Sequence, residues 1–436
     1  MTATSLTRPR GVLFGQRARS ALVGGSLALI VVSGATIALA AAWPDSALIR
    51  NPVPVRPGWL SGPLAPLSVR VTHAQFLLLE CAMAVGYAGV LAAGAEVRRR
   101  LVLGAIVALH VVFLLAPPLL SGDVFSYLSY ARLGALHGID PYVHGPIAAR
   151  GDPAFALTSW KHAASAYGPL FTVASYPLAQ LSLPLAIWTL KLLAAASSLG
   201  CVALVWRIAG QVGVSRARAV AVYGLNPIVL VWTLGGAHND LLMLLLVLAG
   251  VSLALASREA LGGAAVVAAA AVKATAGIAL PFMLIGVRRG VRAAVGAGLA
   301  AASILGLAAV VFPGQALGVA HVLEHEQRLV AFDGVPKVVA RLVGLPGVTG
   351  PVRLAGHVAF VMVAVGFCVA VRRGYDWIAA CGWALVAIVV TTPWFLAWYT
   401  VWPLPFAAVG RSRRLLAATI VLELYFFVNH VPALKL

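Results

Sequence analysis

Residues 101–127 read LVLGAIVALHVVFLLAPPLLSGDVFSY, an apolar run that passes into a polar and aromatic segment. The run from Leu101 to Leu120 has the length of about 20 residues that a helix needs to cross a bilayer. Asp123 stands at the outer end of this run, although the chain has only 13 acidic residues in 436. Because ionisable groups at membrane depth are costly and usually functional, Asp123 is the first candidate for a functional residue.

The composition is that of an integral membrane protein. Hydrophobic residues make up 61% of the chain and charged residues 10%, whereas a soluble domain of this size needs far more polar surface. The net charge is +19, but the arginines fall in short clusters between apolar runs, as the positive-inside rule expects. The basic charge therefore predicts contact with a lipid bilayer and no nucleic-acid partner.

The spacing of the apolar runs predicts an all-α fold, a polytopic transmembrane bundle of about 11–13 spans. We expect residues 1–19 to form a cytoplasmic tail and residues 20–436 a single integral membrane domain. The N-terminal run resembles a signal peptide but is longer, which favours an uncleaved first helix. The expected spans lie near residues 20–42, 74–95, 101–120, 184–206, 219–234, 241–256, 293–312, 353–371, 377–392, 399–410 and 415–433.

Short basic connectors set the expected sidedness, because the positive-inside rule places them in the cytoplasm. Asp123 and the segment His238–Asp240 then emerge on the opposite, extracytoplasmic face of a bacterial plasma membrane. Three long loops, at residues 43–73, 121–168 and 313–350, share that face. The basic connectors lie at residues 97–100, 207–218, 288–292, 372–373 and 411–414.

Two segments depart from this simple alternation. Residues 169–183 are apolar, but an additional span there does not fit the alternation of sides that the basic connectors set. We therefore expect a half-inserted or surface helix, and whether it crosses the membrane stays open. Residues 259–287 lie between two basic ends that both belong inside. They predict a re-entrant pair of short helices meeting near Lys273, with that side chain pointing into a cavity.

The residues that follow Asp123 predict one functional helix face. If they are helical, Asp123, Tyr127, Tyr130 and Gly134 lie on the same side, at i, i+4, i+7 and i+11. That face carries a carboxylate, two phenols and a small residue that permits close approach. The alternative is that Asp123 only caps a helix start, which leaves the aromatic residues around it unexplained.

Other polar segments on the same face extend the candidate site. Asp140-Pro141-Tyr142 and Tyr167-Gly168-Pro169 are also ordinary turn and helix-start sequences. His238, Asn239 and Asp240 follow two glycines and precede a leucine-rich span. A plain helix cap needs only one of the three, so we interpret them as a wall of the site.

The aromatic segment 391–403 contains Trp394, Trp398, Tyr399 and Trp402. Such residues form interfacial belts, and they also bind sugar rings, so both interpretations stay open. Within the apolar spans, Glu80 and Glu423 are each expected to face a partner inside the bundle.

The segment His321-Val322-Leu323-Glu324-His325 matches a zinc-protease pattern, but no further ligand accompanies it. The four cysteines lie in apolar runs without metal spacing. We therefore predict no metal and no cofactor. Arg328 and Lys337, in the same loop, suit contact with an anionic head group, although either can be an ordinary solvated side chain.

Taken together, these motifs resemble one enzyme family. Asp-Val-Phe-Ser-Tyr at 123–127, the Gly-Ile-Asp-Pro-Tyr stretch at 138–142, Tyr-Gly-Pro-Leu at 167–170, Asn-Pro before His-Asn-Asp, and Lys273 after an alanine-rich run occur in that order. The chain is similar in these positions to the actinobacterial polyprenyl-phosphomannose-dependent mannosyltransferases, of the GT-C class of membrane glycosyltransferases. The likeness extends from about residue 101 to about residue 290, the region that contains these motifs.

The resemblance implies a polyprenyl-phosphate sugar donor, an extracytoplasmic site, inversion at the anomeric carbon, and an α-linked mannose in a cell-envelope glycan or glycolipid. It also implies that Asp123 is the catalytic base. An acceptor hydroxyl needs such a base, whereas a lipid phosphate leaves as a stable anion and needs cations or donors. The candidate substrate-binding residues are Tyr127, Tyr130, Asp140, Tyr142, Tyr167, His238, Asn239, Asp240, Lys273, Arg328, Trp394 and Tyr399.

Two alternatives stay open. A transporter or flippase of lipid-linked sugars would place its charges along a path through the membrane, whereas these gather at one surface. An enzyme of the same architecture could use another sugar, such as arabinose or glucose, because a few hydrogen bonds decide that choice. The acceptor, the linkage and the oligomeric state do not follow from the sequence.

Overall fold

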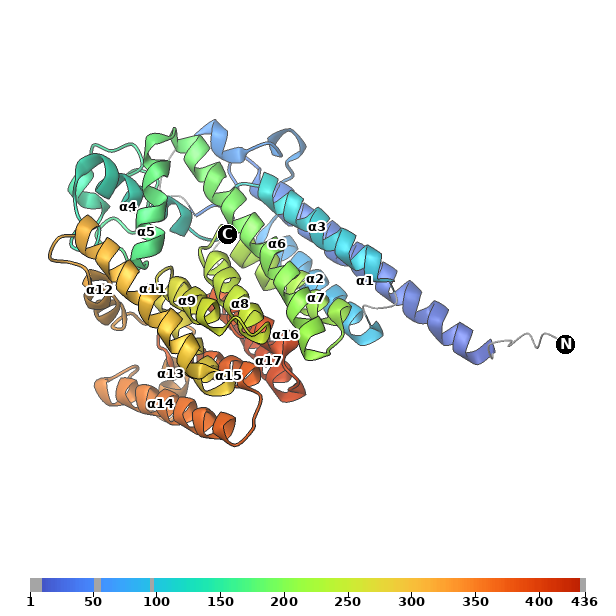
Figure 1. Ribbon diagram of the computed structural model, residues 1–436. Coiled ribbons are helices and arrows are strands. Elements are labelled where there is room, and N and C mark those ends of the chain that lie inside the picture. The colour runs from blue at the N-terminus through green and yellow to red at the C-terminus, as the bar shows by residue number, and fades with distance from the viewer. Residues whose placement is uncertain (1–9, 51–55, 95–97, 432–436) are drawn as a thin grey trace.

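The computed structural model describes residues 10–50, 56–94 and 98–431. Within these ranges the chain forms helices and no strand, which confirms the predicted all-α fold (Figure 1). Long helices run side by side through the body of the molecule. Shorter helices gather at one end, at the left of Figure 1.

The first layer consists of α1 (Arg10–Ala41), α2 (His73–Ala93) and α3 (Arg99–Leu115). The second helix begins at a capping box, in which Thr72 accepts from the backbone of Gln75 and the Gln75 side chain accepts from the backbone of Thr72. Its inner face packs on α1 through glycine. A Cβ atom on Gly86 would lie 2.7 Å from the carbonyl oxygen of Ser26. Small residues of this kind let membrane helices approach closely.

The centre is built on α6 (Leu183–Val212), which packs against α3, α7 (Arg216–Gly224) and α8 (Asp240–Leu255). The next layer pairs α8 with α9 (Glu259–Ala270), and α9 with α11 (Gly290–Val311). Glycines again line these contacts, since Gly250 meets the backbone of Gly262 in the α8–α9 pair.

The C-terminal part adds five more helices. They are α10 (Ala279–Gly286), α14 (Gly350–Arg372), α15 (Trp377–Thr391), α16 (Leu404–Val409) and α17 (Arg413–Asn429). The predicted inward partner of Glu423 is present, because the Asn226 amide donates to both carboxylate oxygens at 3.0 and 2.9 Å. Glu80 is also buried and lies beside the Trp232 indole.

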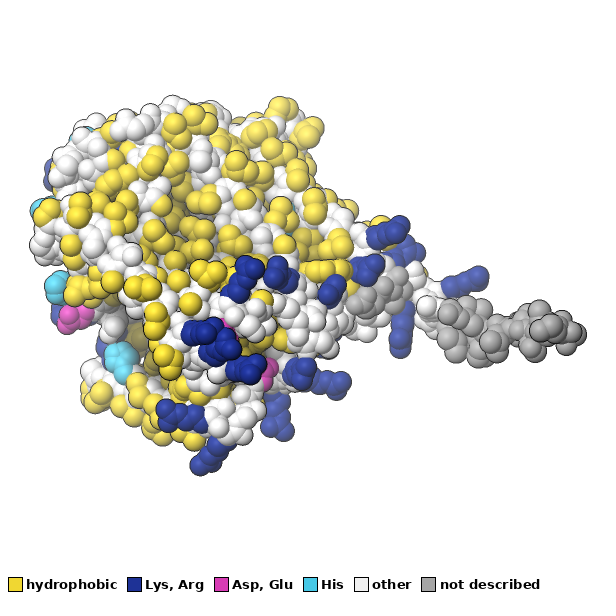
Figure 2. All heavy atoms as spheres, viewed as in Figure 1, with side chains coloured by type: hydrophobic (Ala, Val, Ile, Leu, Met, Phe, Trp, Pro, Cys, Tyr) yellow, Lys and Arg dark blue, Asp and Glu magenta, His cyan; other side chains and the backbone are white. Residues whose placement is uncertain are grey.

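The predicted extracytoplasmic loops contain short helices. Residues 121–168 include α4 (Asp123–His137), and residues 313–350 include α12 (Gly318–Glu326) and α13 (Val335–Leu342). Of these, α4 and α12 form the cap at the left of Figure 1 together with α5 (Pro169–Ser175), whereas α13 packs against α14 and α15. Lys and Arg side chains gather at the other end of the molecule in Figure 2. This separation agrees with the expected topology, whose orientation in the membrane stays a prediction.

Five helices of the described chain are long and apolar enough to cross a membrane, namely α2, α6, α11, α14 and the part of α1 from Gly15. A sixth candidate is the pair formed by α7 and the π-helix η6 (Ile228–Leu234), which are bent by 46° at Asn226-Pro227. The remaining predicted spans are shorter helices, so the predicted count stays a prediction.

Two predicted spans are wrong as continuous helices: residues 219–234, which bend at Asn226-Pro227, and residues 399–410. Residues 399–410 divide into the 3-10 helix η8 (Ala397–Val401) and the six-residue α16. Pro403 and Pro405 explain the break, because proline lacks the N–H that continues a helix and its ring clashes with the preceding turn.

The two unusual segments are short helices, as expected. Residues 169–180 form α5 and then a 3-10 turn, η5 (Tyr176–Gln180). In residues 259–287, α9 ends at Ala270, the chain turns at Lys273, and η7 (Ala274–Ile278) leads into α10. The helix pair flanking Lys273 is confirmed, whereas the side to which it returns stays a prediction.

Candidate functional site

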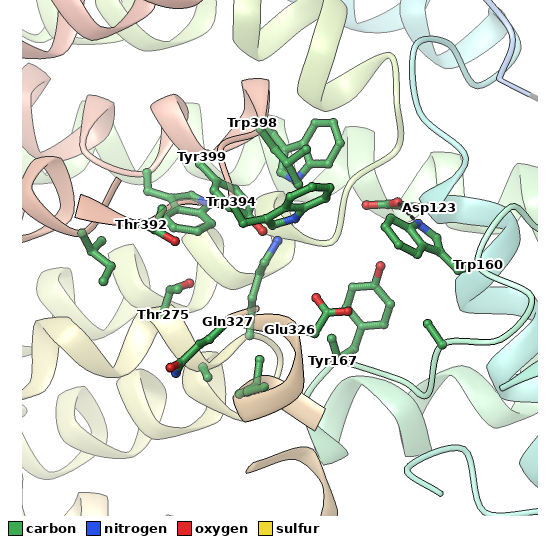
Figure 3. A pocket seen from close by; sticks show the side chains of 18 of the residues that line it. Asp123, Trp160, Tyr167, Thr275, Glu326, Gln327, Thr392, Trp394, Trp398 and Tyr399 are labelled. Carbon is green, nitrogen blue, oxygen red and sulfur yellow. Dashed lines mark hydrogen bonds between the residues drawn. The ribbon is translucent and has the colours of Figure 1, made fainter. Parts of the chain in front are cut away.

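A cavity of about 400 Å³ opens between the cap and the body of the molecule. Side chains from α4, α12, η7, η8 and the loop before α5 point into it (Figure 3). Aromatic rings and a few charges dominate its lining. The polar and aromatic lining residues are Asp123, Tyr130, Trp160, Tyr167, Lys273, Thr275, Glu326, Gln327, Thr392, Trp394, Trp398, Tyr399 and Trp402.

Strained backbone holds the start of α4. Leu120, three residues before Asp123, has φ 61°, a left-handed conformation that is rare for a bulky residue and costs of order 1–3 kcal/mol. Its N–H donates to the carbonyl of Leu48 at 2.6 Å, and the N–H of Leu119 donates to the carbonyl of Gly235 at 3.1 Å. The segment before Asp123 is thus tied to the segment before His238.

Asp123 is the first residue of α4 and presents a partly buried carboxylate to the cavity. The indole N–H of Trp160 donates to Oδ1 at 3.3 Å, and Nδ1 of His238 lies 3.4 Å from Oδ2. Burial alone would raise the pKa of this carboxyl. His238, Lys273 and Trp160 outweigh burial and hold the pKa below its ordinary value. Asp123 is therefore an anion at neutral pH.

The predicted wall His238–Asp240 stands directly behind the cavity. His238 is fully buried and stacks on Trp398, with ring centroids 3.7 Å apart. Asn239 accepts from the Tyr127 hydroxyl at 3.3 Å and donates its backbone N–H to the same hydroxyl at 3.2 Å. None of these three wall residues lines the cavity, which favours a positioning role over direct substrate contact.

Asp240 holds the cavity's lysine. Its fully buried carboxylate accepts from Nζ of Lys273 at 2.8 Å on both oxygens, and from the Trp402 indole at 2.6 Å. The ammonium also lies 5.1 Å from the ring centre of Tyr399 and 5.5 Å from that of Trp402. Lys273 reaches the cavity from the turn after α9, as the sequence predicted.

The residues of the predicted α4 face differ in their access to the cavity. Tyr130 lines the cavity and donates to the carbonyl of Ala163 at 2.9 Å. Tyr127 is buried behind it, edge-on to Tyr167, with centroids 4.7 Å apart. A side chain on Gly134 would clash with the Tyr176 ring, so the small residue does permit the predicted close approach.

Asp140 and Tyr142 organise the loop without lining the cavity. The Asp140 carboxylate accepts from the N–H of Tyr142 at 2.8 Å, a local turn contact. The Tyr142 hydroxyl donates to the carbonyl of Tyr167 at 2.9 Å. Tyr167, which accepts this hydrogen bond, does line the cavity.

Of the remaining candidates, Trp394 and Tyr399 line the cavity, and Arg328 does not. Arg328 is exposed, and its carbonyl accepts from Arg353 at 2.7 Å. The loop instead brings Glu326 to the cavity, at the end of α12. Sequence reasoning missed this residue, because the motif at 321–325 drew attention to Glu324.

The segment 321–325, which matches the zinc-protease pattern, lies on α12 with its His and Glu side chains facing solvent. His321, Glu324 and His325 are exposed on α12. Within residues 10–50, 56–94 and 98–431, no three His, Cys, Asp or Glu side chains converge as a metal site would require. The expectation of a metal-free reaction stays a prediction.

Comparison with known proteins adds evidence to this geometry. The sequence profile described as "Alpha-(1->6)-mannopyranosyltransferase, N-terminal domain" matches residues 22–289. The chain is 33% identical to alpha-(1->6)-mannopyranosyltransferase A of Mycobacterium tuberculosis, over 74% of this chain and 68% of that protein. It is also 33% identical to alpha-(1->6)-mannopyranosyltransferase A of Corynebacterium glutamicum, over 41% of this chain and 37% of that protein.

No solved structure matches the chain. The profile match runs from within α1 to the end of α10, and it includes Asp123, His238–Asp240 and Lys273. The residues from 290 onwards, which carry Glu326 and the Trp394–Trp402 segment, lie beyond it.

Proposed function

This chain belongs to the alpha-(1->6)-mannopyranosyltransferase family, and from that premise we propose that it transfers mannose from a polyprenyl-phosphate donor to a cell-envelope glycan or glycolipid. The acceptor hydroxyl attacks the anomeric carbon with inversion and forms an α-linkage. The reaction takes place at the extracytoplasmic face of the plasma membrane.

The observation that carries the proposal is the Asp123 carboxylate, which faces the cavity with Lys273 in the same cavity wall. Asp123 takes the proton of the acceptor hydroxyl as the new C–O bond forms. Such a positioned base contributes about 10²–10⁴-fold to a rate. The Trp160 indole donates to Oδ1 of this carboxylate and the His238 ring lies beside Oδ2, so the two side chains orient it.

The donor enters from the side of the cavity that carries Lys273. Three apolar residues of the cavity lining, Ile278, Ile388 and Leu396, suit a lipid chain. As the bond between the anomeric carbon and the phosphate oxygen breaks, the phosphate accumulates negative charge, which the ammonium of Lys273 stabilises. Asp240 keeps that ammonium in place.

The direct test uses membranes that contain the protein, radiolabelled polyprenyl-phosphomannose and an oligomannoside acceptor. Wild type is expected to transfer label, and Asp123→Asn to lose transfer by about 10²–10⁴-fold. Asp376→Asn is the matched control, because Asp376 caps α15 away from the cavity and asparagine retains the capping oxygen. No transfer by wild type would refute the donor assignment.

A further inference from the structure

Glu326 is a second carboxylate in the cavity, and no step proposed so far uses it. It is the last residue of α12, it is half-buried, and its side chain points into the cavity near Tyr167 (Figure 3). Asp123 and Glu326 thus line the same space from two elements far apart in sequence.

Among the residues that the structure describes, none donates a hydrogen bond to the Glu326 carboxylate. Burial raises its pKa, the charge of Asp123 raises it further, and only Lys273 acts in the opposite direction. No hydrogen bond within the described part of the chain contributes to this balance. A carboxylate that loses water without gaining a donor is unfavourable, so a bound ligand that supplies donors would relieve it.

The chemistry of the cavity indicates which donors these are. A lipid phosphate is itself an anion and is repelled by Glu326, whereas a sugar hydroxyl is a neutral donor. The rings of Trp160, Trp394 and Tyr167 stand around the same part of the cavity and supply faces for a sugar.

The helix that carries Glu326 is held in place. Val322, one turn earlier, packs with Tyr142 and Phe312. Beyond α12, the N–H of Ala331 donates to the carbonyl of Pro393 at 3.0 Å, and His430 pairs with the buried Asp333 at 2.9 Å. These contacts fix the position of Glu326 relative to Trp394, which follows Pro393. A residue that selects a substrate must be held in place in this way.

We propose that Glu326 accepts hydrogen bonds from hydroxyl groups of the acceptor sugar and orients the attacking hydroxyl toward Asp123. It is a specificity-determining residue for the acceptor, not for the donor. The assignment rests on the proposed function of the cavity.

The test compares wild type with Glu326→Gln and Glu326→Ala, and uses Glu324→Gln as the matched control on the exposed side of the same helix. Acceptor and donor KM are measured with polyprenyl-phosphomannose and a synthetic α-linked dimannoside. Loss of a hydrogen bond to a charged group predicts an acceptor KM higher by about 10–100-fold in Glu326→Ala. Donor KM and the control variant are expected to match wild type.

A second arm uses dimannosides that each lack one hydroxyl. In wild type, removal of the hydroxyl that Glu326 binds raises KM. In Glu326→Ala the same removal adds no further increase, because the two changes delete one interaction. The melting temperature of each purified variant shows that it is folded.

Three results would overturn the inference: a higher donor KM at unchanged acceptor KM, a lower kcat at unchanged acceptor KM, or equal penalties for every deoxy acceptor in wild type and variant. An active wild type with any of these results contradicts only the role of Glu326. A wild type that transfers nothing from this donor contradicts the proposed function itself.

Discussion

At the scale of single residues, the site depends on charges that are set by their neighbours. Asp123 is held by His238 and Trp160, and Lys273 by Asp240 and Trp402. The sequence indicated Asp123 and Lys273 because charged residues are costly in such surroundings. It could not show that Asp240 is fully buried beneath Lys273, because that pairing joins the first residue of α8 to the turn after α9.

The lowered pKa of Asp123 predicts the pH dependence of the reaction. The base acts as an anion, so kcat/KM is expected to stay level at neutral pH and fall only below the ordinary titration range of aspartate. Lys273 lowers this pKa, so Lys273→Met is expected to move the acid limb to higher pH as well as reduce the rate. An acid limb that stays in place in Lys273→Met would contradict the electrostatic assignment.

The Asp240–Lys273 pair predicts a coupled effect on stability. Asp240→Asn leaves the ammonium of Lys273 without its anion, which costs about 3–5 kcal/mol for a buried pair. Lys273→Met added to Asp240→Asn is expected to restore part of this loss, since no unpaired charge then remains. Denaturation of the three purified variants measures the coupling. Strictly additive losses would show that the two side chains do not interact.

At the scale of elements, hydropathy predicted which segments are helical but not where helices break. The long helices α2, α6, α11 and α14 follow directly from apolar runs. The π-helix after Asn226-Pro227 and the division at Pro403 depend on backbone conformation that hydropathy does not report. Glu326 escaped notice for a similar reason, because only tertiary packing turns the end of α12 toward Asp123.

Close contact between α9 and α11 predicts a position-specific effect of a larger side chain. A Cβ on Gly296 would clash with the carbonyl of Ala260, whereas nothing lies within 4 Å of one on Gly298 in the same helix. Gly296→Val is expected to destabilise the protein by about 1–3 kcal/mol or more, and Gly298→Val by much less. Similar melting temperatures for both variants would refute the close packing of these helices.

At the scale of the whole molecule, the separation of charge supports one orientation. Basic side chains gather away from the cap (Figure 2). The cavity lies between the cap and the body. The sequence predicted this division from loop charge, because lysine and arginine near spans favour the cytoplasm. Length and composition identify five helices of the described chain that can span a membrane, or six if the bent pair α7–η6 is one span. The other apolar helices are shorter than a span needs, so their length does not show whether they cross.

Orientation is tested by cysteine labelling in a variant that lacks the exposed Cys81. Val143 lies half exposed in the cap, and Tyr375 is exposed near the basic end. With an impermeant thiol reagent on intact cells, Val143→Cys is expected to react and Tyr375→Cys to react only after lysis. The reverse pattern would place the cavity in the cytoplasm.

The most direct test of the central claim is the single-turnover rate of mannosyl transfer with donor and acceptor both bound. If Asp123 is the base, Asp123→Asn slows this step by about 10²–10⁴-fold while the acceptor dissociation constant changes little. A variant that transfers mannose at nearly the wild-type rate would contradict the claim.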